Sequence, residues 1–171
     1  MTKEVIIKQS LTEKTLTKVS MYILYSGRTK YYLLLVLFIF TFNATSAYWT
    51  GIEPAENELG FIPLITMIIV VVSLFFNLAN RSKKSFKKNP RYYTNLVFTI
   101  NETEFKTEGE NFLNACKWED LVKIKSTKKW HLIYFNKMQA SIIDRSQLDT
   151  LQEGELKEIF NSIKSKIKVV N

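Results

Sequence analysis

An uncharged apolar stretch, residues 59–80, reads LGFIPLITMIIVVVSLFFNLAN. Its 22 residues can cross about 30 Å of hydrocarbon as a helix. The thirteen Leu, Ile, Phe and Val residues between Phe61 and Leu78 favour insertion into a bilayer by roughly 4 to 8 kcal/mol. Pro63 falls in the first turn, where a missing N–H costs little. We therefore expect a transmembrane helix over about residues 60–79.

A second uncharged stretch, residues 31–52, has the same length and predicts another span, over about residues 31–50. Tyr31 and Tyr32 at one end, and Tyr48 and Trp49 at the other, suit the two membrane interfaces. The alternative is a buried hairpin in a soluble protein. However, the roughly 90 residues that remain could not cover two helices that are apolar on every face. The sequence thus predicts a two-helix hairpin.

The charges around the two apolar stretches predict the orientation of this hairpin. Residues 1–30 carry six Lys or Arg and two Glu, residues 51–59 carry three Glu and no base, and residues 81–95 carry six bases and no acid. The positive-inside rule then places both termini in the cytoplasm. Residues 96–171 are nearly balanced, with twelve bases and eleven acids, so the net charge of +8 arises almost wholly in the flanking stretches. This distribution argues against nucleic-acid binding by the folded part.

The basic stretch after the second span is the one candidate binding site in the sequence. In one interpretation it is a topology signal with solvated side chains. In the other it contacts anionic lipids, at about 1 kcal/mol per base near a charged leaflet. The candidate lipid-contacting residues are Arg81, Lys83, Lys84, Lys87, Lys88 and Arg91.

The N-terminal segment predicts a short strand followed by a helix. Val5–Lys8 favours a strand, and Ser10-Leu-Thr-Glu13 matches a capping box in which Ser10 caps the helix. Apolar residues at helical spacing then continue until Gly27. The helix could lie on the membrane or pack on the folded part. We expect the strand to join the sheet formed by the C-terminal part, because both lie on the same side of the membrane.

Beyond Pro90 the pattern changes to short strands separated by turn residues. The predicted strands are Leu96–Ile100, Thr103–Thr107, Phe112–Lys117, Leu121–Ser126, Trp130–Phe135 and Met138–Ile143. The last segment switches to helical spacing, with apolar residues Leu156, Ile159, Phe160, Ile163 and Ile167. An antiparallel meander followed by one amphipathic helix predicts a bent sheet or open barrel capped by that helix, as in pleckstrin-homology-like domains.

Three segments of this part carry a resemblance to a known family. They are Cys116–Ile124 (CKWEDLVKI), Trp130–Phe135 (WHLIYF) and Ala140–Arg145 (ASIIDR). Together they resemble the YcxB-like family of bacterial membrane proteins, whose members typically have an N-terminal strand, two transmembrane helices and a C-terminal domain of this pattern. This chain has Asp144-Arg145 where many members have Pro followed by a base. The resemblance implies a bacterial inner (cell) membrane location and names no activity.

The expected fold class is therefore a membrane α-helical hairpin plus an α+β cytoplasmic domain. The expected divisions are an N-terminal strand and amphipathic helix, the hairpin, a basic juxtamembrane linker and a YcxB-like cytoplasmic domain. Their bounds are residues 1–30, 31–80, 81–95 and 96–171.

Residues able to perform chemistry are few. His131, the only histidine, has no second Cys or His at metal-ligand spacing and is expected to be structural. Cys116, the only cysteine, is expected to be a buried, inert thiol. Trp118 and Trp130 are expected in the core. No nucleophile elbow, phosphate-binding loop, HExxH or CxxC motif occurs. We expect no enzyme, no catalytic residue, no metal and no cofactor.

Two functions fit these observations. The first is a membrane-anchored cytoplasmic interaction module with an unidentified ligand. The second is a membrane-embedded regulatory or immunity-type protein that acts through its transmembrane helices. The partners implied are the lipid bilayer, with anionic lipids as candidates at the basic linker, and a protein partner at the membrane as a further candidate.

Overall fold

The computed structural model describes residues 3–26, 31, 34–39, 41–42, 45 and 62–170. The chain divides into two compact units. One comprises Met1–Val19 with Lys83–Asn171, and the other comprises Ser20–Ser82. The predicted loop at residues 51–59 and parts of the predicted first span lie outside the described residues.

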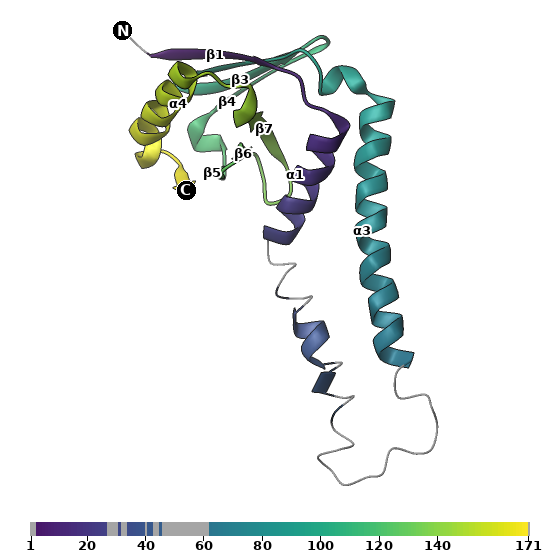
Figure 1. Ribbon diagram of the computed structural model, residues 1–171. Coiled ribbons are helices and arrows are strands. Elements are labelled where there is room, and N and C mark those ends of the chain that lie inside the picture. Colours follow the sequence, from purple (N-terminus) through teal and green to yellow (C-terminus); the bar gives the residue numbers. More distant parts are fainter. Residues whose placement is uncertain are drawn as a thin grey trace, which may run out of the picture. The chain divides into compact units, whose positions relative to one another are not determined.

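The first unit contains an antiparallel sheet in the order β1-β2-β3-β4 (Figure 1). These strands are β1 (Glu4–Gln9), β2 (Leu96–Asn101), β3 (Glu104–Gly109) and β4 (Phe112–Lys117). The predicted N-terminal strand therefore pairs with the C-terminal part, with Ile7 opposite Phe98. Alternate residues of β1 are buried, as expected for a strand with one face toward a core.

A second sheet has the order β7-β6-β5-β8. Its strands are β5 (Lys123–Ser126), β6 (Trp130–Tyr134), β7 (Ala140–Asp144) and β8 (Lys168–Val170). The six strands predicted after Pro90 are all present, with ends shifted by a few residues. The prediction of a single antiparallel meander is wrong, because the strands form two sheets and β8 pairs in parallel with β5.

The core lies between the sheets and beneath α4 (Thr150–Ser162). Trp118, in the 3₁₀ turn η3 (Trp118–Asp120), is fully buried, and its indole N–H donates to Asn101 O at 2.8 Å. The prediction of a core position is confirmed for Trp118 but not for Trp130, which is half-buried. Cys116 is half-exposed on β4, where burial and the charge of Asp120 raise the pKa of its thiol.

The C-terminal helix is present but shorter than predicted. Asp149 caps α4 in a capping box with Gln152, and α4 packs against β1 and β2. After α4 the chain forms the turn η5 (Ile163–Ser165) and then β8. The predicted continuation to Ile167 is wrong, since the β-branched residues after it complete the edge of the second sheet by pairing with β5.

Helix α1 (Glu13–Ser26) begins where the sequence placed a helix, but its cap differs. The Thr12 hydroxyl accepts from the Thr15 N–H at 3.1 Å, the bond expected of an N-cap residue. The Ser10 hydroxyl instead accepts from the Asn95 N–H at 3.0 Å. The predicted Ser10–Glu13 capping box is therefore wrong, because Ser10 joins the N-terminal segment to the chain just before β2.

The second unit contains most of α3 (Ile62–Lys88), the 27-residue helix over the predicted second span. Within the described part of the chain, no helix combines the length and the apolar character that crossing a membrane requires. The predicted transmembrane hairpin thus lacks support from the described helices. The α+β fold with antiparallel strands and a C-terminal helix is confirmed.

Candidate polar binding site

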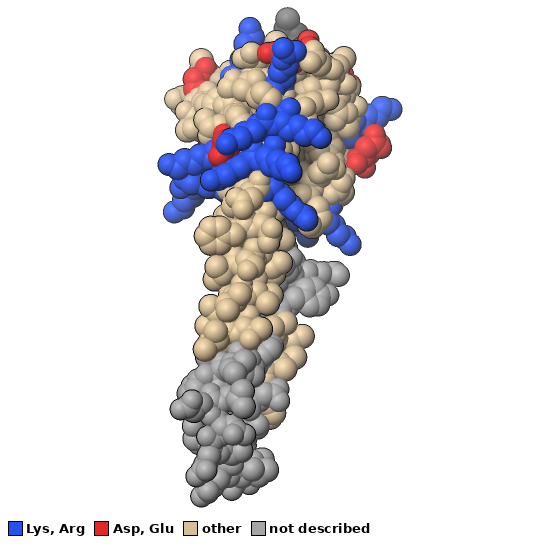
Figure 2. Space-filling view, turned by 90° about the vertical axis from the view of Figure 1, so that its right-hand side faces the viewer, with Lys and Arg blue, Asp and Glu red and all other residues tan. Residues whose placement is uncertain are grey.

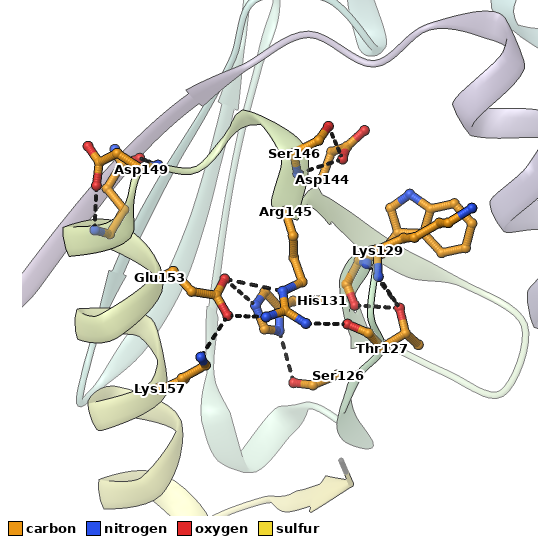
Figure 3. Close-up of polar contacts among 12 residues, drawn as sticks. Ser126, Thr127, Lys129, His131, Asp144, Arg145, Ser146, Asp149, Glu153 and Lys157 are labelled. Carbon is orange, nitrogen blue, oxygen red and sulfur yellow. Dashed lines mark hydrogen bonds and ion pairs between the residues drawn. The ribbon is translucent and has the colours of Figure 1, made fainter.

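A cluster of polar side chains joins the second sheet to α4 (Figure 3). Ser126 ends β5, His131 lies in β6, and Arg145 begins the turn η4 (Arg145–Gln147) that leads to α4. Glu153 is placed in the first part of α4 by the capping box that starts this helix. The cluster therefore forms only because the fold brings together residues that are far apart in the sequence.

Glu153 is the centre of the cluster. Arg145 donates to its carboxylate through Nη2 at 2.5 Å and through Nε at 3.3 Å. His131 Nε2 lies 3.1 Å from Oε2, and Lys157 Nζ lies 3.3 Å from Oε1, one helical turn further along α4. The Glu153 side chain is only 17% exposed. A carboxylate with this little water needs such donors to remain charged.

Arg145 also fixes the turn between β5 and β6. Its Nη1 donates to Thr127 O at 2.6 Å, and its backbone N–H donates to Lys129 O at 3.0 Å. The Thr127 hydroxyl accepts from the backbone N–H groups of Lys129 and Trp130. The guanidinium group of Arg145 therefore connects this turn to α4, and its contacts with both elements fix its position.

His131 is 1% exposed, with hydrogen-bonding partners at both ring nitrogens. Nδ1 lies 2.9 Å from Ser126 Oγ, and Nε2 faces Glu153. A neutral ring that donates from Nε2 and accepts at Nδ1 satisfies both contacts. Burial lowers the pKa of His131 below its ordinary value, and the hydrogen bond to Glu153 opposes this effect in part. The ring is thus neutral at pH 7, and its expected structural role fits these contacts.

The pKa of Glu153 is lowered as well. Burial alone would raise it, but the hydrogen bonds from His131 and Arg145 have the larger combined effect. Glu153 is therefore an anion at neutral pH.

Two cavities flank Arg145. One, of about 600 Å³, is lined by Lys18, Lys128, Lys129, the half-buried Trp130 and the start of α4, among others. The other, of about 530 Å³, is lined by Lys128, Arg145 and Lys157 together with Ser126, Thr127, His131 and Asn161 on its polar side. Phe160 and Val169 supply apolar surface in the second cavity. A charged ligand with a small apolar part would meet suitable groups there.

The arrangement of Ser126, His131 and Glu153 has the residue types of a hydrolytic triad, but the backbone amide that follows Ser126 is already committed to the turn. An acyl-transfer site needs free N–H donors beside the nucleophile. The Thr127 N–H, adjacent to Ser126, donates to Trp130 O at 2.8 Å. Across the described residues, no group of three His, Cys, Asp or Glu side chains is arranged to hold a metal ion.

The basic residues predicted to contact lipid lie elsewhere. Arg81, Lys83, Lys84, Lys87 and Lys88 occupy the last turns of α3 with exposed side chains, and Figure 2 shows Lys and Arg side chains gathered around this end of the helix. Arg91 lies in the turn η2 (Pro90–Tyr92), and its Nε is 3.4 Å from Glu110 Oε2. Five of the six bases thus share the last turns of α3, and none of the six lines either cavity beside Arg145.

The polar cluster, apart from His131, was missed by sequence reasoning. Glu153 and Lys157 are four residues apart in a predicted helix, which is a recognisable ion-pair spacing. Nothing local signals that Arg145 and Ser126 would join them.

Comparison with known proteins gives one match. No curated protein and no solved structure matches the chain. A family model described as YcxB-like protein matches residues 100–160, which run from the end of β2 into α4 and include most of the polar cluster. The resemblance seen in the sequence is therefore confirmed for this segment, which is similar to the YcxB-like family.

Proposed function

We propose that the chain is a membrane-anchored, non-enzymatic binding module. Its two apolar stretches would form the membrane hairpin, and its folded unit would be a pleckstrin-homology-like cytoplasmic domain that holds a ligand or partner at the membrane surface. The location would be the bacterial cell membrane, with both termini in the cytoplasm.

One observation carries the proposal: large apolar side chains are exposed along α3 and give way directly to bases. Ile69, Val72 and Phe76 are 59%, 47% and 66% exposed. Exposed apolar surface on this scale is uncommon on a soluble monomer and is typical of an interaction with membrane or protein. The bases that begin at Arg81 then match the cytoplasmic end of a span.

The domain assignment is supported by the architecture of the first unit. Two four-stranded sheets, largely antiparallel, enclose one core, and the amphipathic α4 packs against one of them. Binding without catalysis is supported by the polar cluster. Its groups satisfy one another, and the amide beside Ser126 is committed to the turn.

Fractionation of cells that express the full chain tests the anchoring. The wild-type chain should stay in the membrane fraction after alkaline carbonate extraction. Replacing Ile69, Val72 and Phe76 by Lys should release a large part of it, because only the first apolar stretch would then still favour insertion. Each Lys costs about 2.5 to 3.5 kcal/mol at the centre of a span, so three of them cancel the roughly 4 to 8 kcal/mol that favour insertion.

The matched control is Leu113→Lys. Leu113 is 70% exposed on β4, so the same change of residue type there should leave the chain in the membrane fraction. Extraction of the wild-type chain by carbonate would overturn the proposal.

A further inference from the structure

We propose that the cavity lined by Lys128, Arg145 and Lys157 is a binding site for a phosphate ester. This inference deepens the proposed binding function by naming a ligand class, and it does not depend on membrane attachment. The cavity has a volume of about 530 Å³.

The charge of the cavity lining selects an anion. The three basic side chains are accompanied by hydroxyl, amide and imidazole groups, and no Asp or Glu among the described residues lines this cavity. Glu153, which contacts three of the lining residues, is committed to Arg145, His131 and Lys157. With His131 neutral, the three bases exceed this single acid by two charges. A phosphate monoester carries about −1.5 to −2 at neutral pH, which matches that excess.

Arg145 supplies oriented donors. A guanidinium group has five N–H donors, and three of them are accounted for by Glu153 and Thr127. The other two have no acceptor among the described residues. Because the side chain is already held on two sides, ordering it for a ligand costs little additional entropy. Planar, paired donors of this kind suit phosphate oxygens.

The two lysines of the site come from different elements of the fold. Lys128 comes from the turn between β5 and β6 and makes no ion pair with any described carboxylate, whereas Lys157 comes from α4 and has one contact of 3.3 Å to Glu153. Both side chains are exposed enough to reorient toward a ligand. Phe160 and Val169 offer apolar contact to the organic part of an ester, which inorganic phosphate lacks.

Titration calorimetry of the purified full chain in a neutral detergent tests the site. The probes are inorganic phosphate, glycerol 3-phosphate and dihexanoyl phosphatidic acid, a short-chain lipid that is also a phosphate monoester. We expect an ester to bind more tightly than inorganic phosphate. The double variant Lys128→Gln/Lys157→Gln should weaken that binding by at least about tenfold, and higher salt should weaken the wild type.

Lys164→Gln is the matched control, because this exposed lysine in η5 lines neither cavity beside Arg145. It should bind as the wild type does. Tighter binding of glycerol 3-phosphate would identify a free ester as the ligand, and binding of the short-chain lipid alone would identify a lipid headgroup. No binding of either ester, or equal binding by the double variant, would overturn the site.

Carbonate extraction of the double variant separates the two proposals. If the variant stays in the membrane fraction while ester binding is absent from both chains, only the ligand assignment fails. If the wild-type chain is extracted but binds the ester, only the anchoring fails.

Discussion

The pairing of β1 with β2 predicts that a residue near the N-terminus stabilises a core formed mainly by residues after 90. Ile7 is fully buried opposite Phe98, whereas its neighbour Ile6 is 54% exposed on the other face of the same strand. Replacing a buried Ile by Ala typically costs 2 to 5 kcal/mol, because it removes apolar contact and leaves a cavity. We expect about 3 kcal/mol for Ile7→Ala.

Ile6→Ala is the matched control. Both substitutions lose the same β-branched side chain from the same strand, so their effects on strand propensity are similar. They differ in burial, and about half of the Ile6 side chain remains in water. We expect Ile6→Ala to cost about 1 kcal/mol or less.

Urea denaturation of the full chain in a mild detergent, followed by tryptophan fluorescence, measures both effects. Fully buried Trp118 reports on the core. With a slope of about 1 to 3 kcal/mol per molar urea, the midpoint of Ile7→Ala should lie about 0.7 to 2 M below that of Ile6→Ala. Equal midpoints would refute the reasoning and show that β1 adds nothing to the stability of the core.

Three further predictions concern buried polar groups. Glu153→Gln should lower the free energy of unfolding by about 2 to 4 kcal/mol in urea denaturation, because it removes the charge that holds its donors, while the exposed Glu155→Gln should change it by less than about 0.5 kcal/mol. Because burial lowers the pKa of His131 below its ordinary value of 6.5, protonation of this ring favours the unfolded chain. The urea midpoint should therefore be constant above about pH 6.5 and fall below that pH. A midpoint that rises on acidification would contradict the buried neutral ring. Trp118→Phe should cost about 1 to 3 kcal/mol through its lost volume and the unpaired Asn101 carbonyl, and a change near zero would place Trp118 outside the core.

The strands were predictable because their signals are local. Alternating apolar residues flanked by turn residues identified six of the seven strands described after Pro90, and the same pattern identified β1. The joining of β1 to the C-terminal strands, though not its pairing with β2 in particular, followed from placing both termini on one side of a membrane. It receives further support from Gln9, whose buried side chain donates to Ile142 O and accepts from Asp144 N–H, so that β1 also contacts β7.

Other features depend on long-range contacts that a sequence pattern does not contain. The division into two sheets occurs at η3, where Trp118 turns the chain between β4 and β5. β8 is only three residues long and follows residues at helical spacing, so the periodicity favoured a longer helix. The polar cluster unites Ser126, Arg145 and Glu153 from separate elements, and each of them alone resembles an ordinary surface residue.

Cysteine labelling in intact cells tests the central claim, that the chain spans the membrane twice with its folded unit in the cytoplasm. Cys116 is first replaced by Ser, and a single cysteine is introduced at Asn57 or at Asn171. A membrane-impermeant maleimide should label the cysteine at position 57 in intact cells, and the cysteine at position 171 only after permeabilisation. Labelling at position 171 in intact cells, or protection of position 57 until permeabilisation, would contradict this topology.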